Sequence, residues 1–127
     1  MFKLPENYTW THVVNPITEE EVRTWVANLR SGNFKQGNGY LNANESYCCL
    51  GVLGKDNLVP ADIGHPMYAV EGYMASSQCT LSGNTLTGSH VEFKMPHRLQ
   101  ARYYGLNDSE EKSFAEIADA IEQDFGL

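Results

Sequence analysis

The sequence predicts an α+β fold that forms a single domain over residues 1–127. Two segments, one near each end, combine a capping box with apolar residues at helical spacing. Between residues 68 and 93, short alternating segments are separated by Gly, Ser and Asn, as in antiparallel strands and their turns. A length of 127 residues with 42% hydrophobic residues suits one core. We therefore expect N- and C-terminal amphipathic helices packed with a short buried helix and a small antiparallel sheet.

The first helix is predicted over residues 19–31. Thr18–Glu21 is a capping box, in which the Thr18 hydroxyl accepts from the Glu21 amide and the Glu21 side chain reaches back. Arg30 near the end suits the helix dipole, and Gly32 is a natural stop. The stripe that would face the core consists of Val22, Trp25, Val26 and Leu29.

The segment Ser46–Leu53 is almost wholly apolar and is predicted to be buried. Eight residues do not distinguish a buried strand from a buried helix by periodicity. Asn44 or Ser46 could cap a helix and Gly54 could end it, so we favour a short helix on which the first and last helices pack. Residues 31–44 are predicted as a loop that could contain one short strand, and residues 55–66 as a loop.

The predicted antiparallel sheet lies in the middle of the chain. Residues 68–74 are expected to form one strand. Residues 79–81 and 85–87 flank Ser82-Gly83-Asn84, which is typical of a hairpin. Residues 90–93 alternate polar and apolar side chains, as a half-buried strand does.

Two further helices are predicted near the C-terminus. Pro96 suits the first position of a helix that presents Leu99 and Tyr103 on one face and stops at Gly105. A second capping box begins at Ser113 and predicts a helix over residues 114–125. Its apolar stripe consists of Phe114, Ile117, Ala118, Ile121 and Phe125.

Composition and charge narrow the classes of function. The net charge of −7 argues against non-specific nucleic-acid binding, because that binding needs many cationic side chains. No apolar run is long enough for a membrane span, and the N-terminus lacks the pattern of a signal peptide. Three cysteines, two of them adjacent, suit a reducing compartment better than a disulfide framework. We expect a cytoplasmic protein.

Cys48-Cys49 is the most unusual local feature. At the start of a helix, a thiol can be activated by the helix dipole, and His90 or His97 could act as its base. A cysteine-dependent hydrolase or transferase is therefore an alternative function. Buried packing is the favoured interpretation, because free cysteines are among the most buried residues. The spacing of cysteines and histidines does not match a zinc site, so neither a metal nor another cofactor is expected.

A cationic cluster between residues 94 and 104 is the candidate ligand-binding site. Arg98 and Arg102 share one helix face, and Arg98 falls in the first turn, where backbone N–H groups can meet an anion. Tyrosines beside them could stack on a base. A set of surface ion pairs with acidic residues is the favoured interpretation of these cations, because such pairs are common. The candidate residues are Lys94, His97, Arg98, Arg102, Tyr103 and Tyr104.

Three segments together resemble a group of small bacteriophage proteins. They are residues 29–37 (LRSGNFKQG), residues 47–53 (YCCLGVL), and residues 106–108 (LND) followed by residues 113–122 (SFAEIADAIE). The resemblance spans most of the chain, and the double cysteine is its most specific part. The group often continues from the double-cysteine segment with Cys-Asp, whereas here Gly54 follows Leu53.

The resemblance implies a non-enzymatic phage accessory protein that acts in the cytoplasm of the host bacterium. Such genes often encode inhibitors of host defence. The expected partner is then a nucleotide-derived small molecule that carries phosphate, or a host defence protein. Whether the protein acts as a monomer or as a homo-oligomer stays open. No catalytic residue is carried over from the group.

Overall fold

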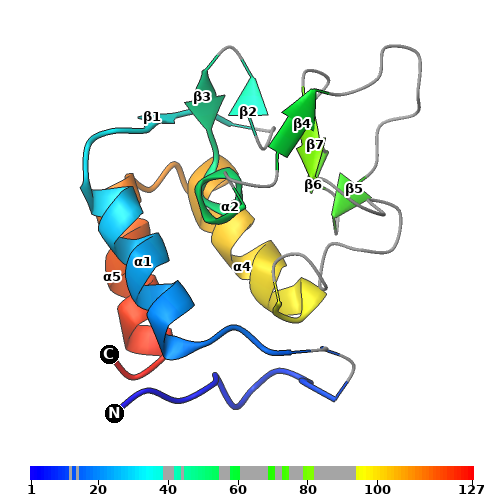
Figure 1. The fold of residues 1–127 in the computed structure, drawn as a ribbon, viewed down its shortest axis with the longest axis vertical. Helices are drawn as coiled ribbons and strands as arrows, with labels where there is room; N and C mark the ends of the chain where they lie inside the picture. The colour runs from blue at the N-terminus through cyan, green and yellow to red at the C-terminus, as the bar shows by residue number, and fades with distance from the viewer. Residues whose placement is uncertain are drawn as a thin grey trace.

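The computed structural model describes residues 1–11, 13, 15–38, 42–43, 45–54, 58–60, 69–70, 73–74, 79–81 and 94–127. In this part of the chain the helices are α1 (Glu19–Arg30), α2 (Cys49–Leu53), α4 (His97–Asp108) and α5 (Phe114–Asp124). The strands are β1 (Lys35–Gln36), β2 (Asn42–Ala43), β3 (Ser46–Tyr47), β4 (Leu58–Pro60), β5 (Ala69–Val70), β6 (Tyr73–Met74) and β7 (Cys79–Leu81). The predicted mixture of helices and short strands is confirmed (Figure 1).

The two terminal helices form where the capping boxes predict them. The Thr18 hydroxyl accepts from the Glu21 amide at 3.2 Å, and the Ser113 hydroxyl accepts from the Glu116 amide at 3.2 Å. α1 buries all four residues of its predicted stripe. It ends at Arg30, one residue earlier than predicted, and α5 ends at Asp124 with Phe125 as its C-cap.

The short buried helix is also confirmed, but its cap is not the one predicted. Cys48 is the N-cap of α2, and its sulfur accepts from the Gly51 amide at 3.2 Å. Ser46 cannot take that role, because it lies in β3 and pairs with both neighbouring strands. Gly54 is the C-cap, as expected.

The predicted stop of α4 at Gly105 is wrong. The helix continues to Asp108, and Pro96 is its N-cap rather than its first residue. Glycine lowers helix propensity by about 1 kcal/mol, which tertiary packing readily overrides. Here the continuation buries Leu106 and Asn107 beyond the glycine, so tertiary contacts extend the helix.

The strands do not form one antiparallel sheet. β1 and β3 pair in parallel, and β2 adds to the other edge of β3 in the antiparallel sense, which gives the order β1-β3-β2. The prediction of a purely antiparallel sheet is therefore wrong. It failed because the parallel pair is made by residues 35–36 and 46–47, outside the segment in which we sought the sheet. Two separate antiparallel pairs, β4 with β7 and β5 with β6, follow.

The middle of the chain differs from the prediction in two further ways. Residues 68–74 are not one strand, because β5 and β6 are separate strands that pair with each other in the antiparallel sense. Residues 55–66 are not all loop, because β4 lies within them and pairs with β7. The second hairpin arm (85–87) and the strand at 90–93 lie outside the described residues.

The core lies between the helices. α1 lies alongside α5, and α2 sits against α1 and α4 (Figure 1). α2 therefore packs chiefly on the first helix and on α4, rather than on the first and last helices as expected. The Trp25 indole N–H donates to the Cys49 carbonyl at 2.8 Å, and the Trp25 and Tyr103 rings meet edge to face, 5.4 Å between centroids. These contacts join three helices at one point.

The two ends of the chain meet beside α5. The Met1 amino group donates to the Gly126 carbonyl at 3.1 Å, and the Lys3 amide donates to the Phe125 carbonyl at 2.8 Å. Phe2 stacks on Phe125. Among the helices of the described part, none has the length and apolar character needed to cross a membrane.

Candidate functional site

The two adjacent cysteines are buried in the helical core. Both have no solvent exposure. The Cys49 thiol donates to the Tyr103 carbonyl at 3.4 Å. Burial raises the pKa of the Cys49 thiol well above its usual value, and the neighbouring Cys48 and the charge of Asp108 act in the same direction. The thiol is therefore held protonated at neutral pH, which suits packing and not nucleophilic attack.

The predicted imidazole partners are placed only in part. His90 lies outside the described residues. His97 is the first residue of α4 and is partly exposed. Cys49 meets α4 at Tyr103, six residues further on, which is about 9 Å along a helix axis. The contacts of Cys49 thus lead to the middle of α4 and not to His97.

Lys94, at the start of the cationic cluster, is attached to the N-terminal end of α1. Its ammonium group lies 2.8 Å from a carboxylate oxygen of Glu21. Its carbonyl accepts from the Ile17 amide at 2.9 Å, and its backbone adopts a positive φ of 59°. A lysine with that φ is held there by its surroundings, here the backbone bond and the ion pair.

Arg102 and Tyr103 are attached to the end of α5. Asp124 accepts from Arg102 Nε at 2.7 Å, from Arg102 Nη2 at 3.2 Å and from the Tyr103 hydroxyl at 2.8 Å. Burial, followed by the charge of Asp124, raises the pKa of Tyr103. The Tyr103 ring is fully buried, so it packs in the core.

The structure therefore divides the predicted cluster. Lys94 bonds to α1, whereas Arg102 bonds to α5. Arg98 is exposed in the first turn of α4, and Tyr104 is half-buried and packs against the core. Sequence reasoning missed the carboxylates that hold Lys94 and Arg102, since they lie 73 and 22 residues away along the chain.

Two segments that carry the resemblance meet directly. The Gln36 side-chain amide donates to Asn107 Oδ1 at 3.0 Å and to the Lys112 carbonyl at 2.7 Å. Asn107 donates in turn to the Gly37 carbonyl at 2.8 Å and is buried. This polar network fastens β1 to the connection between α4 and α5. It gives these residues a structural role.

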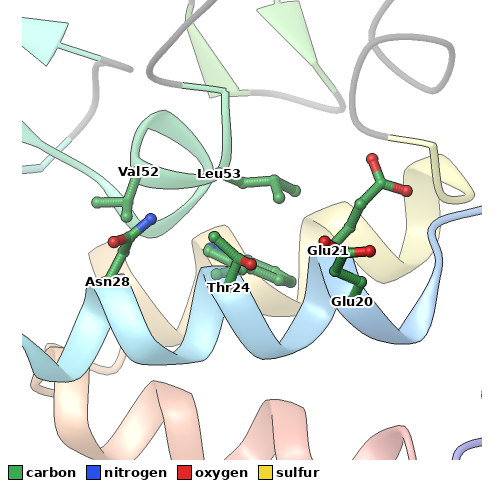
Figure 2. A pocket seen from close by; sticks show the side chains of 7 residues that line it. Glu20, Glu21, Thr24, Asn28, Val52 and Leu53 are labelled. Carbon is green, nitrogen blue, oxygen red and sulfur yellow. The ribbon is translucent and has the colours of Figure 1, made fainter.

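A groove runs between α1 and α2, and the sequence did not predict it. Its volume is about 210 Å³. Figure 2 shows Val52 and Leu53 projecting from α2 above the α1 side chains, with the two carboxylates at one end and Asn28 toward the other. The residues that line it are Glu20, Glu21, Thr24, Trp25, Asn28, Val52 and Leu53. The sequence predicts that α1 packs on the short buried helix, but it does not indicate that the two helices leave a hollow between them.

Comparison with known proteins gives one similarity. Residues 18–62 match the model of a family described as "Domain of unknown function (DUF8296)". No curated protein and no solved structure matches the chain. The matched segment contains α1 and α2, and hence both walls of the groove.

Proposed function

We propose that this protein is a non-enzymatic bacteriophage accessory protein that inhibits a host defence by binding a host protein in the bacterial cytoplasm. The resemblance to small phage proteins supplies the biological setting. We choose a protein partner because the candidate ligand-binding side chains already form bonds within the protein. Lys94 holds Glu21, while Arg102 and Tyr103 hold Asp124.

Because Lys94, Arg102 and Tyr103 are already bonded to carboxylates, a protein partner is favoured over a phosphate ligand. A phosphate at this position would have to compete with two carboxylates that already neutralise the cations. The buried Tyr103 ring offers no face on which a base could stack.

The proposal is tested by expressing the protein in bacteria that each carry one defence system. We expect plaque formation to be restored for at least one system when a sensitive phage infects the cells. The control is a variant that is unfolded by Trp25→Asp, since Trp25 is buried at the helix junction. If no defence system is relieved while the folded protein accumulates, the proposal is wrong.

A second candidate function has one specific observation in its favour. Arg98 is exposed in the first turn of α4, and Pro96 caps that helix without a side-chain hydrogen bond. The N-terminus of a helix favours anions. Sequestration of a phosphate-bearing, nucleotide-derived signal is the corresponding function.

Calorimetric titration with cyclic dinucleotides and ADP-ribose derivatives separates the two candidates. We expect no heat of binding for any of them with the folded protein. Saturable binding that is abolished by Arg98→Ala, and retained in Arg23→Ala, would replace the first candidate with the second. Arg23 is an exposed arginine on α1 and serves as the matched control.

A further inference from the structure

We infer that the groove between α1 and α2 binds a cationic segment of a partner protein, with one apolar side chain of that segment seated in the groove. This inference deepens the proposed function and rests on it. It concerns an interaction surface made by Glu20, Thr24 and Leu53 together with the buried Trp25 and Val52.

The floor of the groove suits an apolar anchor. Leu53 is only partly covered and supplies apolar surface that an anchor can contact, while Trp25 and Val52, each 1% exposed, form the packed layer beneath it. A volume of about 210 Å³ has room for one or two side chains. Protein interfaces concentrate their binding energy in a few anchor residues that fill pockets of this kind.

The rim of the groove selects the sign of the partner's charge. Among the described residues that line it, the charged ones are Glu20 and Glu21. Glu21 is engaged with Thr18 and Lys94, whereas Glu20 is exposed and forms no ion pair within the described part of the chain. Glu20 is therefore the carboxylate available to a lysine or arginine of the partner.

The surface continues beyond the groove onto the outward face of α1. A second, more open hollow is lined by Glu19, Glu20, Arg23, Thr24 and Ala27. Glu20 and Thr24 line both hollows, so the two adjoin along this edge of α1. Glu19 and Arg23 neutralise each other at 2.9 Å, which leaves Glu20 as the net charge of the shared rim.

Charge complementarity identifies the class of occupant. A net charge of −7 attracts cationic partners and speeds their association. A nucleotide phosphate would meet the Glu20 carboxylate unfavourably. A second copy of this chain would bring the same negative charge. A basic, amphipathic protein segment can pair a cation with Glu20 at the rim and place an apolar side chain in the groove.

The test uses a fluorescein-labelled amphipathic Leu/Lys peptide and a matched Leu/Glu peptide, with binding followed by fluorescence anisotropy. The full-length protein should bind the Leu/Lys peptide and not the Leu/Glu peptide. Thr24→Arg places a long side chain over the groove, and Glu20→Lys reverses the rim charge. Each should raise the Kd about tenfold or more.

Two matched variants control for folding and for overall charge. Ala115→Arg adds the same side chain at an exposed position of α5, and Glu110→Lys reverses an exposed charge away from the groove. Both should leave the Kd within about twofold of the wild type, since distant surface charges act weakly at physiological salt. Circular dichroism confirms that each variant is folded.

Several outcomes would overturn the inference. The first is that the folded wild type does not bind the Leu/Lys peptide. The second is that Thr24→Arg and Ala115→Arg lose the same amount of affinity for it. The third is that Thr24→Arg leaves the Kd unchanged. The plaque assay reports separately on the proposed function. If Thr24→Arg still relieves a defence system as the wild type does, the inference about the groove is wrong and the proposed function stands. Absence of relief in the wild type would overturn the proposed function whatever the peptide binds.

Discussion

Cys49 illustrates how a residue that looks reactive in the sequence is used for packing. Its carbonyl accepts from Trp25, its thiol donates to the Tyr103 carbonyl, and its side chain has no exposure. Each of these contacts comes from a different helix or from a residue far along the chain. The local sequence therefore suggested a reactive thiol, whereas contacts with residues distant in sequence bury it and make it unreactive.

The buried thiols should be unreactive while the protein is folded. We expect Cys48 and Cys49 to react with iodoacetamide at pH 7–8 at least about a hundredfold more slowly than a free thiol, because burial raises the pKa of Cys49 and blocks access. The measurement is mass spectrometry of a Cys79→Ser variant, which removes the third cysteine. Denaturant should restore ordinary reactivity, and rapid labelling of the folded protein would contradict the prediction.

Glu21 should make stability depend on pH in the acid range. Burial raises the pKa of Glu21, but hydrogen bonds from Lys94 and Thr18 outweigh it, and the pKa falls below its usual value of 4.5. The folded state therefore holds the charged form more readily than the unfolded chain does. The resulting stabilisation is present above pH 4.5 and is lost as the pH falls through the folded-state pKa.

Thermal melting between pH 7 and pH 3 tests this dependence. Glu21→Gln keeps a side chain that can complete a capping box but removes the charge. We expect the variant to have a lower Tm than the wild type at pH 7, and the difference to shrink below pH 4.5. Glu110→Gln, at an exposed position, is the control. A difference that stays constant with pH would show that the charge of Glu21 has no part in it.

At the scale of elements, helix prediction succeeded where the signal was local. The capping boxes at Thr18 and Ser113 form as predicted because all their donors and acceptors lie within four residues. The stop at Gly105 failed because burial of Leu106 and Asn107 outweighs one residue's preference. The strand predicted over residues 79–81 is confirmed as β7, but its partner is β4, which lies in a segment predicted to be a loop. The other pairings were missed because each strand is two or three residues long and pairs with a segment that no local pattern identifies.

The candidate site was predicted less well than the helices, because its contacts join residues that lie far apart along the chain. The sequence placed Lys94 and Arg102 in one cationic cluster and favoured ion pairs with acidic residues as the role of such cations. It could not show that Glu21 and Asp124 hold them, since those pairings depend on how α1, α4 and α5 pack. The groove was missed entirely, because it exists only where α2 lies over α1.

The network between β1 and α4 should show energetic coupling. Asn107→Ala removes the acceptor of Gln36 and the donor to Gly37 in a buried setting, so we expect a loss of about 2–4 kcal/mol in the free energy of unfolding. Gln36→Ala should cost less, because Gln36 is only partly buried. Urea denaturation of both variants and of the double variant gives the coupling. A strictly additive double variant would contradict the direct contact.

At the scale of the whole molecule, the chain ends close against each other and complete the core. Phe2 covers Phe125, and the Met1 and Lys3 backbones bond to the turn that follows α5. Gly126 makes this approach possible. It has a positive φ of 74°, and a Cβ there would lie 2.5 Å from the Met1 carbonyl oxygen.

Two glycine substitutions should therefore differ in cost. Gly32 also has a positive φ, of 78°, but an added Cβ would meet open space. We expect Gly32→Ala to lower stability by about 1 kcal/mol, from backbone conformation alone. Gly126→Ala should cost more, and it should expose Phe2 to solvent. Thermal melts and near-ultraviolet circular dichroism provide the measurement, and equal losses would contradict the close approach.

The junction at Trp25 has a consequence for the segment 18–62, which matches the family model. That segment ends before α4 and α5, yet Trp25 rests on Tyr103 and α1 lies along α5. A domain built from this segment alone would expose much of its apolar surface to water. We therefore expect a fragment that ends at residue 62 not to fold when it is expressed alone. The wall of the groove is then a surface that exists only while α4 and α5 support it from behind.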